Sequence, residues 1–238
     1  MNPDKIYRFE NRHYEYVVKD AHYLIEEAIK RYPGNVAVAV SGGKDSVPLG
    51  HLVKQHCDPL IIWNDSGLEL PESREIIEQL CKQLDCQLAI AKGDAINVWS
   101  ANKGFRNDAK VDRECIINPT ISVLKQYDIS LEFVGLREEE SKGRKIIIRK
   151  YGGIHQNKKW GCATAWPLRK WKAQDSLAYI DEFNLPLHPA YNRVFGKERH
   201  EIRVSWVYDG MWANRGSAIY CRKFYPKIYL KLREVGIL

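Results

Sequence analysis

The chain has 238 residues, a hydrophobic content of 45% and a formal charge of +7, with a sequence pI near 9.0. This composition supports a buried core and excludes wholesale disorder, and no run of about 18 apolar residues predicts a membrane span. Residues 1–16 lack the apolar segment of a signal peptide. We therefore expect a cytoplasmic protein with no membrane partner, whose positive charge suits polyanions such as nucleotides or nucleic acids.

The first half of the chain alternates between helical and strand patterns. Apolar residues at 17, 21, 24 and 28 recur on one helical face and predict a helix over 13–31. Short apolar runs predict strands at 36–40, 59–63, 87–91 and 131–136, and amphipathic patterns predict helices at 45–56, 70–84 and 116–127. The order predicts a Rossmann-like, doubly wound α/β fold: a mainly parallel, five-stranded sheet with helices on both faces.

The second half is less regular. The segment 145–154 (KIIIRKYGGI) is interpreted as a short strand pair or a loop, 172–183 as a helix, and the residues after Pro226 as a last helix. We expect an N-terminal helix in 1–34, an α/β nucleotide-binding domain over 35–192, and a basic extension over 193–238 packed on the same domain. Basic residues are denser after residue 100 and interleave with Trp and Tyr, which is typical of a nucleic-acid surface and also of ordinary solvated charge.

The turn after the first strand reads Ser-Gly-Gly-Lys-Asp-Ser, residues 41–46. A glycine-rich turn that leads from a buried strand into a helix directs backbone N–H groups and the positive end of the helix dipole at one spot. Gly42 and Gly43 permit close approach of a ligand, and Lys44 adds a full charge. The turn therefore predicts a phosphate site. It does not fit a Walker A loop, which needs a glycine at Val38 and Ser or Thr at Asp45.

This turn resembles the PP-loop, SGGxDS, of the ATP pyrophosphatases, and three later segments narrow the resemblance. GLREEESKGR (135–144) is similar to the GLRxxESxxR of the phosphoadenosine phosphosulfate (PAPS) reductase family. WNDSGLELPE (63–72) and the segment 166–192, which contains LPLHPAY, also resemble that family's motifs. The four segments occur in the family's order and cover most of residues 36–192.

The resemblance implies an adenine nucleotide, either ATP or a sulfonucleotide (APS or PAPS), with its phosphates cradled by residues 41–46. It implies that Lys44, Arg137 and Arg144 stabilise the charge of the reacting phosphate or sulfate. The predicted nucleotide-binding residues are Ser41, Gly42, Gly43, Lys44, Asp45, Ser46, Asp65, Gly135 and Arg137.

Several of these positions have two interpretations. Asp45 either binds Mg²⁺ together with phosphate oxygens or caps its own helix. Asp65 either meets the ribose or the metal, or forms an Asx turn. Arg169 either adds to the phosphate site or is a surface arginine, and Glu140 is expected to orient Arg137 or Arg144.

The chain departs from the family where the family's reductases carry their chemistry. It ends in LREVGIL, without the Glu-Cys-Gly-Leu-His tail, and has no cysteine after Cys221. For an iron–sulfur cluster, only Cys115, Cys162 and Cys221 lie in relevant regions, while a four-iron cluster normally needs four thiolates. We therefore expect no cluster.

Three functions remain open at this point. The first, slightly favoured, is cleavage of ATP between the α and β phosphates with adenylation of an acceptor. The second is sulfonucleotide reduction with Cys221, or less favourably Cys162, as nucleophile and a thioredoxin-type reductant. The third is sulfur transfer to, or modification of, a nucleic acid. A nucleotide-binding module without catalysis and a homodimer are further options.

Overall fold

The computed structural model describes residues 3–67, 69–101, 108–193, 195, 198–205 and 218–234. Its core is one six-stranded sheet in the order β3-β2-β1-β4-β6-β5. All neighbouring strands run parallel except β5, which pairs antiparallel with β6 at one edge. The strands are β1 (Asn35–Ala39), β2 (Leu60–Asp65), β3 (Leu88–Lys92), β4 (Ile129–Phe133), β5 (Ile154–Asn157) and β6 (Cys162–Ala165).

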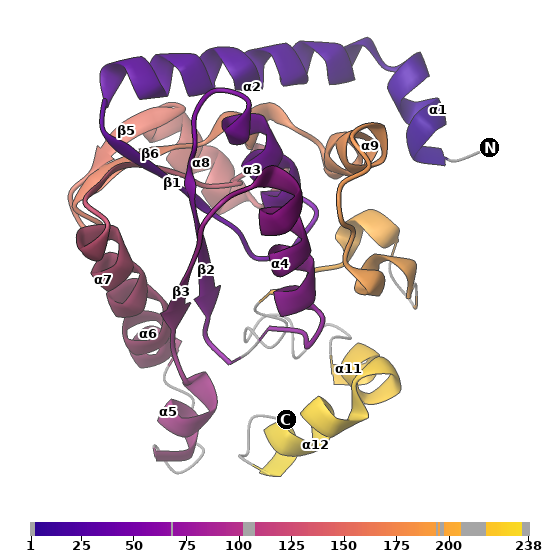
Figure 1. Ribbon diagram of the computed structural model, residues 1–238. Helices are drawn as coiled ribbons and strands as arrows, with labels where there is room; N and C mark the ends of the chain where they lie inside the picture. The colour runs from indigo at the N-terminus through magenta and orange to yellow at the C-terminus, as the bar shows by residue number, and fades with distance from the viewer. Residues whose placement is uncertain are drawn as a thin grey trace.

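Helices cover both faces of the sheet. Successive side chains of a strand point to opposite faces, and apolar side chains on both faces need to be buried. Val36 and Val38 pack with α2 (Arg12–Arg31), α3 (Ser46–Lys54), α4 (Ser73–Leu84) and α9 (Ala173–Glu182). Ala37 between them packs on the other face with α7 (Asn118–Gln126). Figure 1 shows α3 and α4 on one side of the strands and α7 on the other. The predicted doubly wound α/β fold is confirmed, with six strands instead of five.

A second apolar cluster joins the C-terminal region to loops at the end of the sheet. Tyr220, Cys221 and Tyr225 pack there with Leu70 and Val111. Arg193 Nη1 also donates hydrogen bonds to Glu72 Oε1 at 2.7 Å and to Tyr225 Oη at 2.6 Å. The helices of this part of the chain, α11 (Ala218–Phe224) and α12 (Pro226–Glu234), lie at the opposite end of the molecule from α2 in Figure 1. The division into segments 1–34, 35–192 and 193–238 stays a prediction.

The remaining elements connect this frame, and one of them differs from its sequence-based interpretation. Residues 145–151, expected as a strand pair or loop, belong to helix α8 (Lys142–Tyr151). Ser141 caps this helix by accepting a hydrogen bond from Arg144 N, and Gly152, with φ of 72°, ends it. The others are α1 (Pro3–Glu10), α5 (Ala95–Ala101), α6 (Asp108–Val111), a π-helix η1 (Asp112–Ile117), and the 3₁₀ turns η2 (Glu138–Glu140), η3 (Pro167–Lys170), η4 (Pro189–Asn192) and η5 (Arg199–Glu201).

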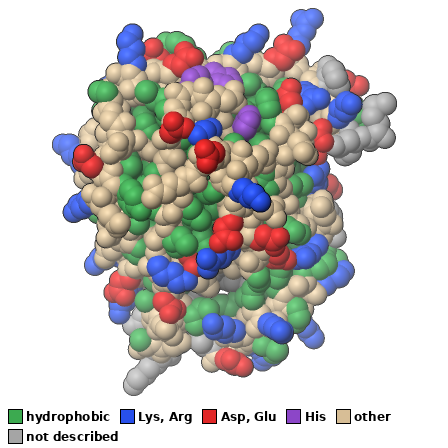
Figure 2. All heavy atoms as spheres, viewed as in Figure 1, with side chains coloured by type: hydrophobic (Ala, Val, Ile, Leu, Met, Phe, Trp, Pro, Cys, Tyr) green, Lys and Arg blue, Asp and Glu red, His purple; other side chains and the backbone are tan. Residues whose placement is uncertain are grey.

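The surface in view in Figure 2 carries basic and acidic side chains side by side, with hydrophobic atoms between them. In the part of the chain that the structure describes, no helix combines the length and the apolar character needed to cross a membrane.

Candidate nucleotide-binding site

The predicted phosphate loop lies where the sheet reverses its order. Strands β2 and β3 lie on one side of β1, and β4 lies on its other side. The loop after β1 and the loop after β4 therefore flank the crevice in which open parallel sheets bind ligands. The two loops touch: a Cβ added at Gly135 would lie 3.4 Å from the backbone carbon and oxygen of Asp45. The GLR segment thus packs directly on the glycine-rich turn.

The glycine-rich turn is held in shape by its own last serine. Ser46 Oγ accepts hydrogen bonds from the amides of Ser41 and Gly43 across 3.0 and 3.2 Å. Gly42 adopts a φ of +73°, and a Cβ there would lie 3.1 Å from the carbonyl oxygen of Ser73. Glycine is therefore required at this position. The sequence predicts that the amides of this turn converge on a ligand, but those of Ser41 and Gly43 are bonded inside the turn.

Tyr191 covers the next amide of the turn. Its hydroxyl accepts a hydrogen bond from Lys44 N at 2.9 Å, and its ring centroid lies 5.8 Å from Lys44 Nζ. Buried His188 fixes this tyrosine: Ala190 N donates to His188 Nδ1, and the two rings meet edge to face. The LPLHPAY segment therefore holds the turn 41–46 through the hydrogen bond between Lys44 N and Tyr191 Oη. Ligand phosphates have to take over the amide hydrogens that Ser46 and Tyr191 now accept.

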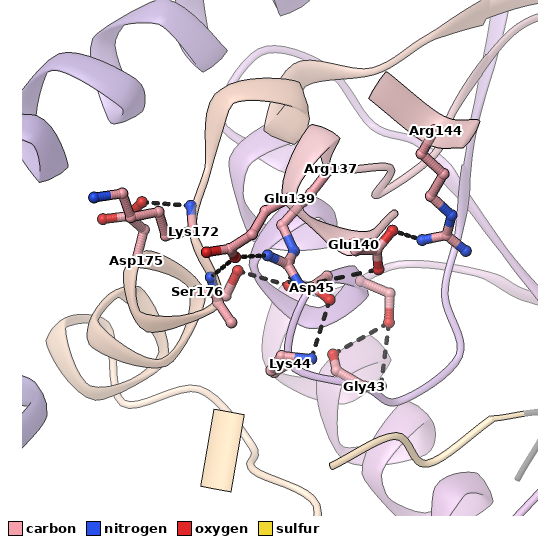
Figure 3. A network of polar contacts seen from close by, with 12 residues as sticks. Gly43, Lys44, Asp45, Arg137, Glu139, Glu140, Arg144, Lys172, Asp175 and Ser176 are labelled. Atoms are coloured by element: carbon pink, nitrogen blue, oxygen red, sulfur yellow. Dashed lines mark hydrogen bonds and ion pairs between the residues drawn. The ribbon is translucent and has the colours of Figure 1, made fainter. Parts of the chain in front are cut away.

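Asp45 is the centre of a buried ionic network that Figure 3 shows from close by. Asp45 Oδ1 lies 2.8 Å from Arg137 Nε and accepts a hydrogen bond from Ser176 Oγ at 2.8 Å. Asp45 Oδ2 lies 3.4 Å from Lys44 Nζ. Asp45 makes no side-chain hydrogen bond that caps α3, so the capping interpretation is wrong. The carboxylate instead holds two of the three predicted catalytic cations, Lys44 and Arg137, together.

Arg137 and Arg144 are linked by carboxylates of the same segment. Arg137 is 4% exposed and lies 2.7 Å from Glu139 and 3.9 Å from Glu140. Glu140 also forms an ion pair with Arg144, so it orients both arginines, as the sequence suggested. Glu139 accepts a further hydrogen bond from Ala173 N, the first residue of α9, at 2.9 Å.

Burial and neighbouring charges shift the pKa values of this network. Burial alone would raise the pKa of Asp45, but Lys44 and Arg137 outweigh it and lower the pKa, so the carboxylate is ionised. Burial lowers the pKa of Lys44, and Arg137 and Arg203 lower it further against the pull of Asp45. Burial and the charge of Arg203 lower the pKa of Arg144 to about 10. An anion placed beside Lys44 and Arg144 would therefore favour the charged forms of both side chains.

Two other predicted residues have different surroundings. Asp65 accepts a hydrogen bond from Gly67 N at 3.3 Å and forms an ion pair with Lys92, which is the Asx turn foreseen as its alternative. Arg169 lies 2.8 Å from Asp20 and lines a separate hollow beside Lys170 and Lys172. Neither side chain joins the network around Asp45.

The donor set around Asp45 does not fit Mg²⁺. This ion prefers oxygen ligands at near-ideal octahedral positions, whereas both carboxylate oxygens of Asp45 are held by Arg137, Ser176 and Lys44. Within the described ranges, no three His, Cys, Asp or Glu side chains are grouped so that they could hold a metal ion. The side chains around Asp45 therefore give no support to Mg²⁺ there, and no step proposed below uses it.

The three cysteines weighed as nucleophiles or cluster ligands are buried among apolar side chains. Cys115 and Cys221 lie in the second apolar cluster, with 1% and 0% of their surface exposed, and Cys162 lies beneath α7. Burial, and then the charge of Glu132, raises the pKa of Cys162 to about 12. Burial likewise raises the pKa of Cys115. The raised pKa values favour the protonated, unreactive thiols of Cys115 and Cys162.

Sequence reasoning missed several residues of this site. Ser176 and Tyr191 lie in the segment that resembles the family, but their contacts reach 131 and 147 residues along the chain. Glu139 falls between the motif positions of GLRxxES. No motif marks Arg203, whose charge lowers the pKa of Lys44 and of Arg144.

A mainly parallel sheet with a glycine-rich turn and buried cations at its switch point defines an α/β nucleotide-binding protein of the PP-loop type. The model of the phosphoadenosine phosphosulfate reductase domain matches residues 35–197. The chain therefore belongs to the phosphoadenosine phosphosulfate reductase family.

Individual proteins resemble this chain in sequence or in fold. Phosphoadenosine 5′-phosphosulfate reductase of Shewanella oneidensis is 25% identical over 169 residues, and the match covers 68% of this chain and 66% of that protein. PAPS reductase of Candida auris, in a phosphate complex, has a TM-score of 0.58 at 14% identity and covers 78% of this chain and 92% of its own. Candida glabrata FMN adenylyltransferase, in complex with FMN and the ATP analogue AMPCPP, has a TM-score of 0.58 at 14% identity. The match covers 78% of this chain and 63% of that protein.

Proposed function

We propose that the protein binds ATP at the turn 41–46, cleaves it between the α and β phosphates, and transfers the adenylyl group to an acceptor. The observation that carries this proposal is the buried network of Lys44, Asp45 and Arg137 at the switch point of the sheet. Such a site offers fixed positive charge where phosphate charge develops. The name of the fold neighbour FMN adenylyltransferase indicates that this architecture supports adenylyl transfer.

The residues have distinct roles in the proposed step. A nucleophilic atom of the acceptor bonds to the α-phosphorus, the bond to the bridging oxygen breaks, and pyrophosphate leaves with the electron pair. The proton of the acceptor passes to water. Lys44 and Arg137 face the charge on the leaving pyrophosphate, and Glu140 holds Arg144 beside Arg137. Amides of the turn exchange Ser46 Oγ and Tyr191 Oη for phosphate oxygens.

The family membership favours a second candidate, reduction of a sulfonucleotide by a thiol. The buried positions of Cys115, Cys162 and Cys221 weigh against it, because attack on sulfur needs an accessible thiolate. This candidate predicts sulfite release from APS or PAPS with a thioredoxin-type reductant, and loss of that release in Cys221→Ser. Retained sulfite release in Cys221→Ser would remove Cys221 from the reaction.

Turnover distinguishes the two candidates. The purified protein is incubated with ATP, APS or PAPS, with and without Mg²⁺, in the presence of candidate acceptors, and pyrophosphate and sulfite are measured. We expect pyrophosphate from ATP and at least a 100-fold loss of its release in Arg137→Ala. The control Lys125→Ala, which alters an exposed lysine of α7, should be unaffected. Sulfite release without any pyrophosphate would contradict the proposed adenylyl transfer.

A further inference from the structure

Helix α8 differs from the other surface helices in its charge. Its ten residues, KGRKIIIRKY, include five basic side chains and no acidic one. Among them, Lys142, Lys145 and Arg149 are exposed and recur at helical spacings of three and four, so they share one face. The helix also leaves Ile146 and Ile147 66% and 45% exposed. A basic face of this kind, without acidic side chains on the same helix, favours a polyanionic partner.

A hollow of about 460 Å³ adjoins this helix. Basic side chains from several elements face it, with two carboxylates and two aromatic rings; its lining is His13, Tyr16, Glu138, Glu139, Lys145, Arg169, Lys170, Trp171 and Lys172. Tyr16 is 53% exposed, and Lys170 Nζ lies 5.0 Å from the centre of its ring. Arg169 and Lys170 are paired with Asp20. The exposed Lys145 and Lys172 therefore offer the cations for phosphate, and Tyr16 offers a ring for a base.

The hollow shares a wall with the candidate nucleotide site. Glu139 lines the hollow, yet its Oε2 is 2.7 Å from Arg137 Nη1 and accepts a hydrogen bond from Ala173 N. Arg137 in turn lies 2.8 Å from Asp45. Contacts from Glu139 to Arg137 and from Arg137 to Asp45 thus link the lining of the hollow to the phosphate turn, and Arg137 and Ala173 N partner the carboxylate of Glu139.

Aromatic side chains extend this surface beyond the hollow. Tyr151, at the end of α8, is 47% exposed and stacks on His155 with 5.1 Å between ring centres. Lys150 Nζ lies 5.1 Å from the centre of the Tyr151 ring. Alternating cations and accessible rings match the alternating phosphates and bases of a single strand, whereas paired bases in a duplex present no ring faces.

We propose that α8 and the adjoining hollow, together called the α8 face, bind a single-stranded nucleic acid that carries the acceptor. This deepens and rests on the proposed adenylyl transfer. Phosphates lie along Lys142, Lys145 and Arg149, and one unpaired nucleotide enters the hollow. A nucleophilic atom of that nucleotide forms the new bond to the α-phosphorus of ATP, pyrophosphate leaves with the bonding electrons, and the released proton passes to water.

The test is fluorescence anisotropy of labelled 20-nucleotide single strands, RNA and DNA, titrated with the full chain from 50 to 300 mM salt. The test variant is Lys142→Glu/Lys145→Glu/Arg149→Glu. The control is Lys30→Glu/Lys82→Glu/Lys125→Glu, which reverses three exposed lysines on α2, α4 and α7. Each variant lowers the formal charge by six, from +7 to +1, so net charge is matched. Calorimetry measures ATP binding by all three proteins, and sedimentation measures their oligomeric state.

The α8 variant is expected to bind the strand at least about 30-fold more weakly, with the salt slope reduced by about 2, since each lost contact with a single strand contributes roughly 0.7. The control should stay within about threefold, and both variants should bind ATP like the wild type. An equal loss in the control, no binding at 50 mM salt, or a dimer that the α8 variant dissolves would overturn the proposal. Strand binding on α8 without any ATP binding would instead contradict the adenylyl transfer and leave the binding surface standing.

Discussion

The ends of β1 and β4 and the α8 face both carry many cations, but they hold them differently. Near the strand ends, Lys44 and Arg137 are 6% and 4% exposed, and ion pairs with Asp45 hold them in place. On α8, Lys145 and Arg149 extend into solvent from a helix that has no acidic residue. A buried cation needs a fixed partner to be tolerated, whereas an exposed cation stays available for a mobile polyanion. The first arrangement suits orientation of one small ligand, and the second suits attraction of a polymer.

Removal of Arg137 should have the largest effect, because it leaves Asp45 buried with less compensation. We expect Arg137→Met to lower the free energy of unfolding by about 3–5 kcal/mol. Urea denaturation measures this change, and Arg149→Met on α8 is the matched control, with an expected change within about 0.5 kcal/mol. Equal effects of the two substitutions would erase the distinction between the two regions.

Glu132 tests what happens when a charge is buried without such a network. Burial raises its pKa from 4.5 to about 7, so the unfolded chain releases this proton at lower pH than the folded one. The resulting penalty on the folded state is absent below about pH 4.5, grows between pH 4.5 and 7, and is complete above pH 7. Glu132→Gln should therefore raise the free energy of unfolding at pH 8 by about 3 kcal/mol.

The same substitution at pH 4 is the internal control, because the Glu132 carboxyl of the wild type is then mostly protonated in both the folded and the unfolded chain. Denaturation midpoints at pH 4, 6 and 8 give the profile. A gain that is constant across these pH values would show that the carboxylate charge of Glu132 is not its source.

Gly42 tests the shape of the phosphate turn. An alanine there must adopt a φ of +73° within 3.1 Å of the Ser73 carbonyl oxygen. Gly42→Ala should cost about 1–2 kcal/mol of stability and weaken ATP binding. Gly143→Ala on α8, where an added Cβ would lie 3.9 Å from Ser141 Oγ, should be neutral or stabilising. Unaltered ATP affinity in Gly42→Ala would mean that the turn does not hold the phosphates.

Tyr191 should give the smallest change. Tyr191→Phe leaves Lys44 N without its acceptor in the free protein, so a ligand phosphate no longer has to displace the hydroxyl. We expect ATP to bind about fivefold more tightly and the free protein to lose about 1 kcal/mol of stability. Weaker ATP binding would indicate that the hydroxyl itself contacts the nucleotide. Calorimetric titration separates these outcomes.

Most of the central sheet could be predicted from the sequence, because its parallel strands are buried on both faces and appear as continuous apolar runs, such as residues 36–40. The sequence did not reveal β6, whose residues Cys162–Ala165 are small and lack a strand pattern. Helix α8 was misread because three consecutive isoleucines suggest a strand, whereas packing buries only Ile148 among them.

The candidate site could likewise be predicted only in part from the sequence. Motifs located the turn 41–46 and the GLR segment, since glycine and charged residues at fixed spacing carry a local signal. The hydroxyls of Ser176 and Tyr191 that complete it come from distant segments and carry no such signal. The bonds of Ser46 to amides of its own turn depend on the backbone conformation, which composition does not specify.

The central claim is that the turn 41–46 and Lys44 bind the phosphates of an adenine nucleotide. Calorimetric titration of ATP into the wild type, Lys44→Ala and the control Lys125→Ala tests it most directly. The account predicts saturable binding of one ATP per chain, weakened about 10- to 100-fold in Lys44→Ala and unchanged in Lys125→Ala. Equal affinity of ATP for Lys44→Ala and the wild type would contradict it.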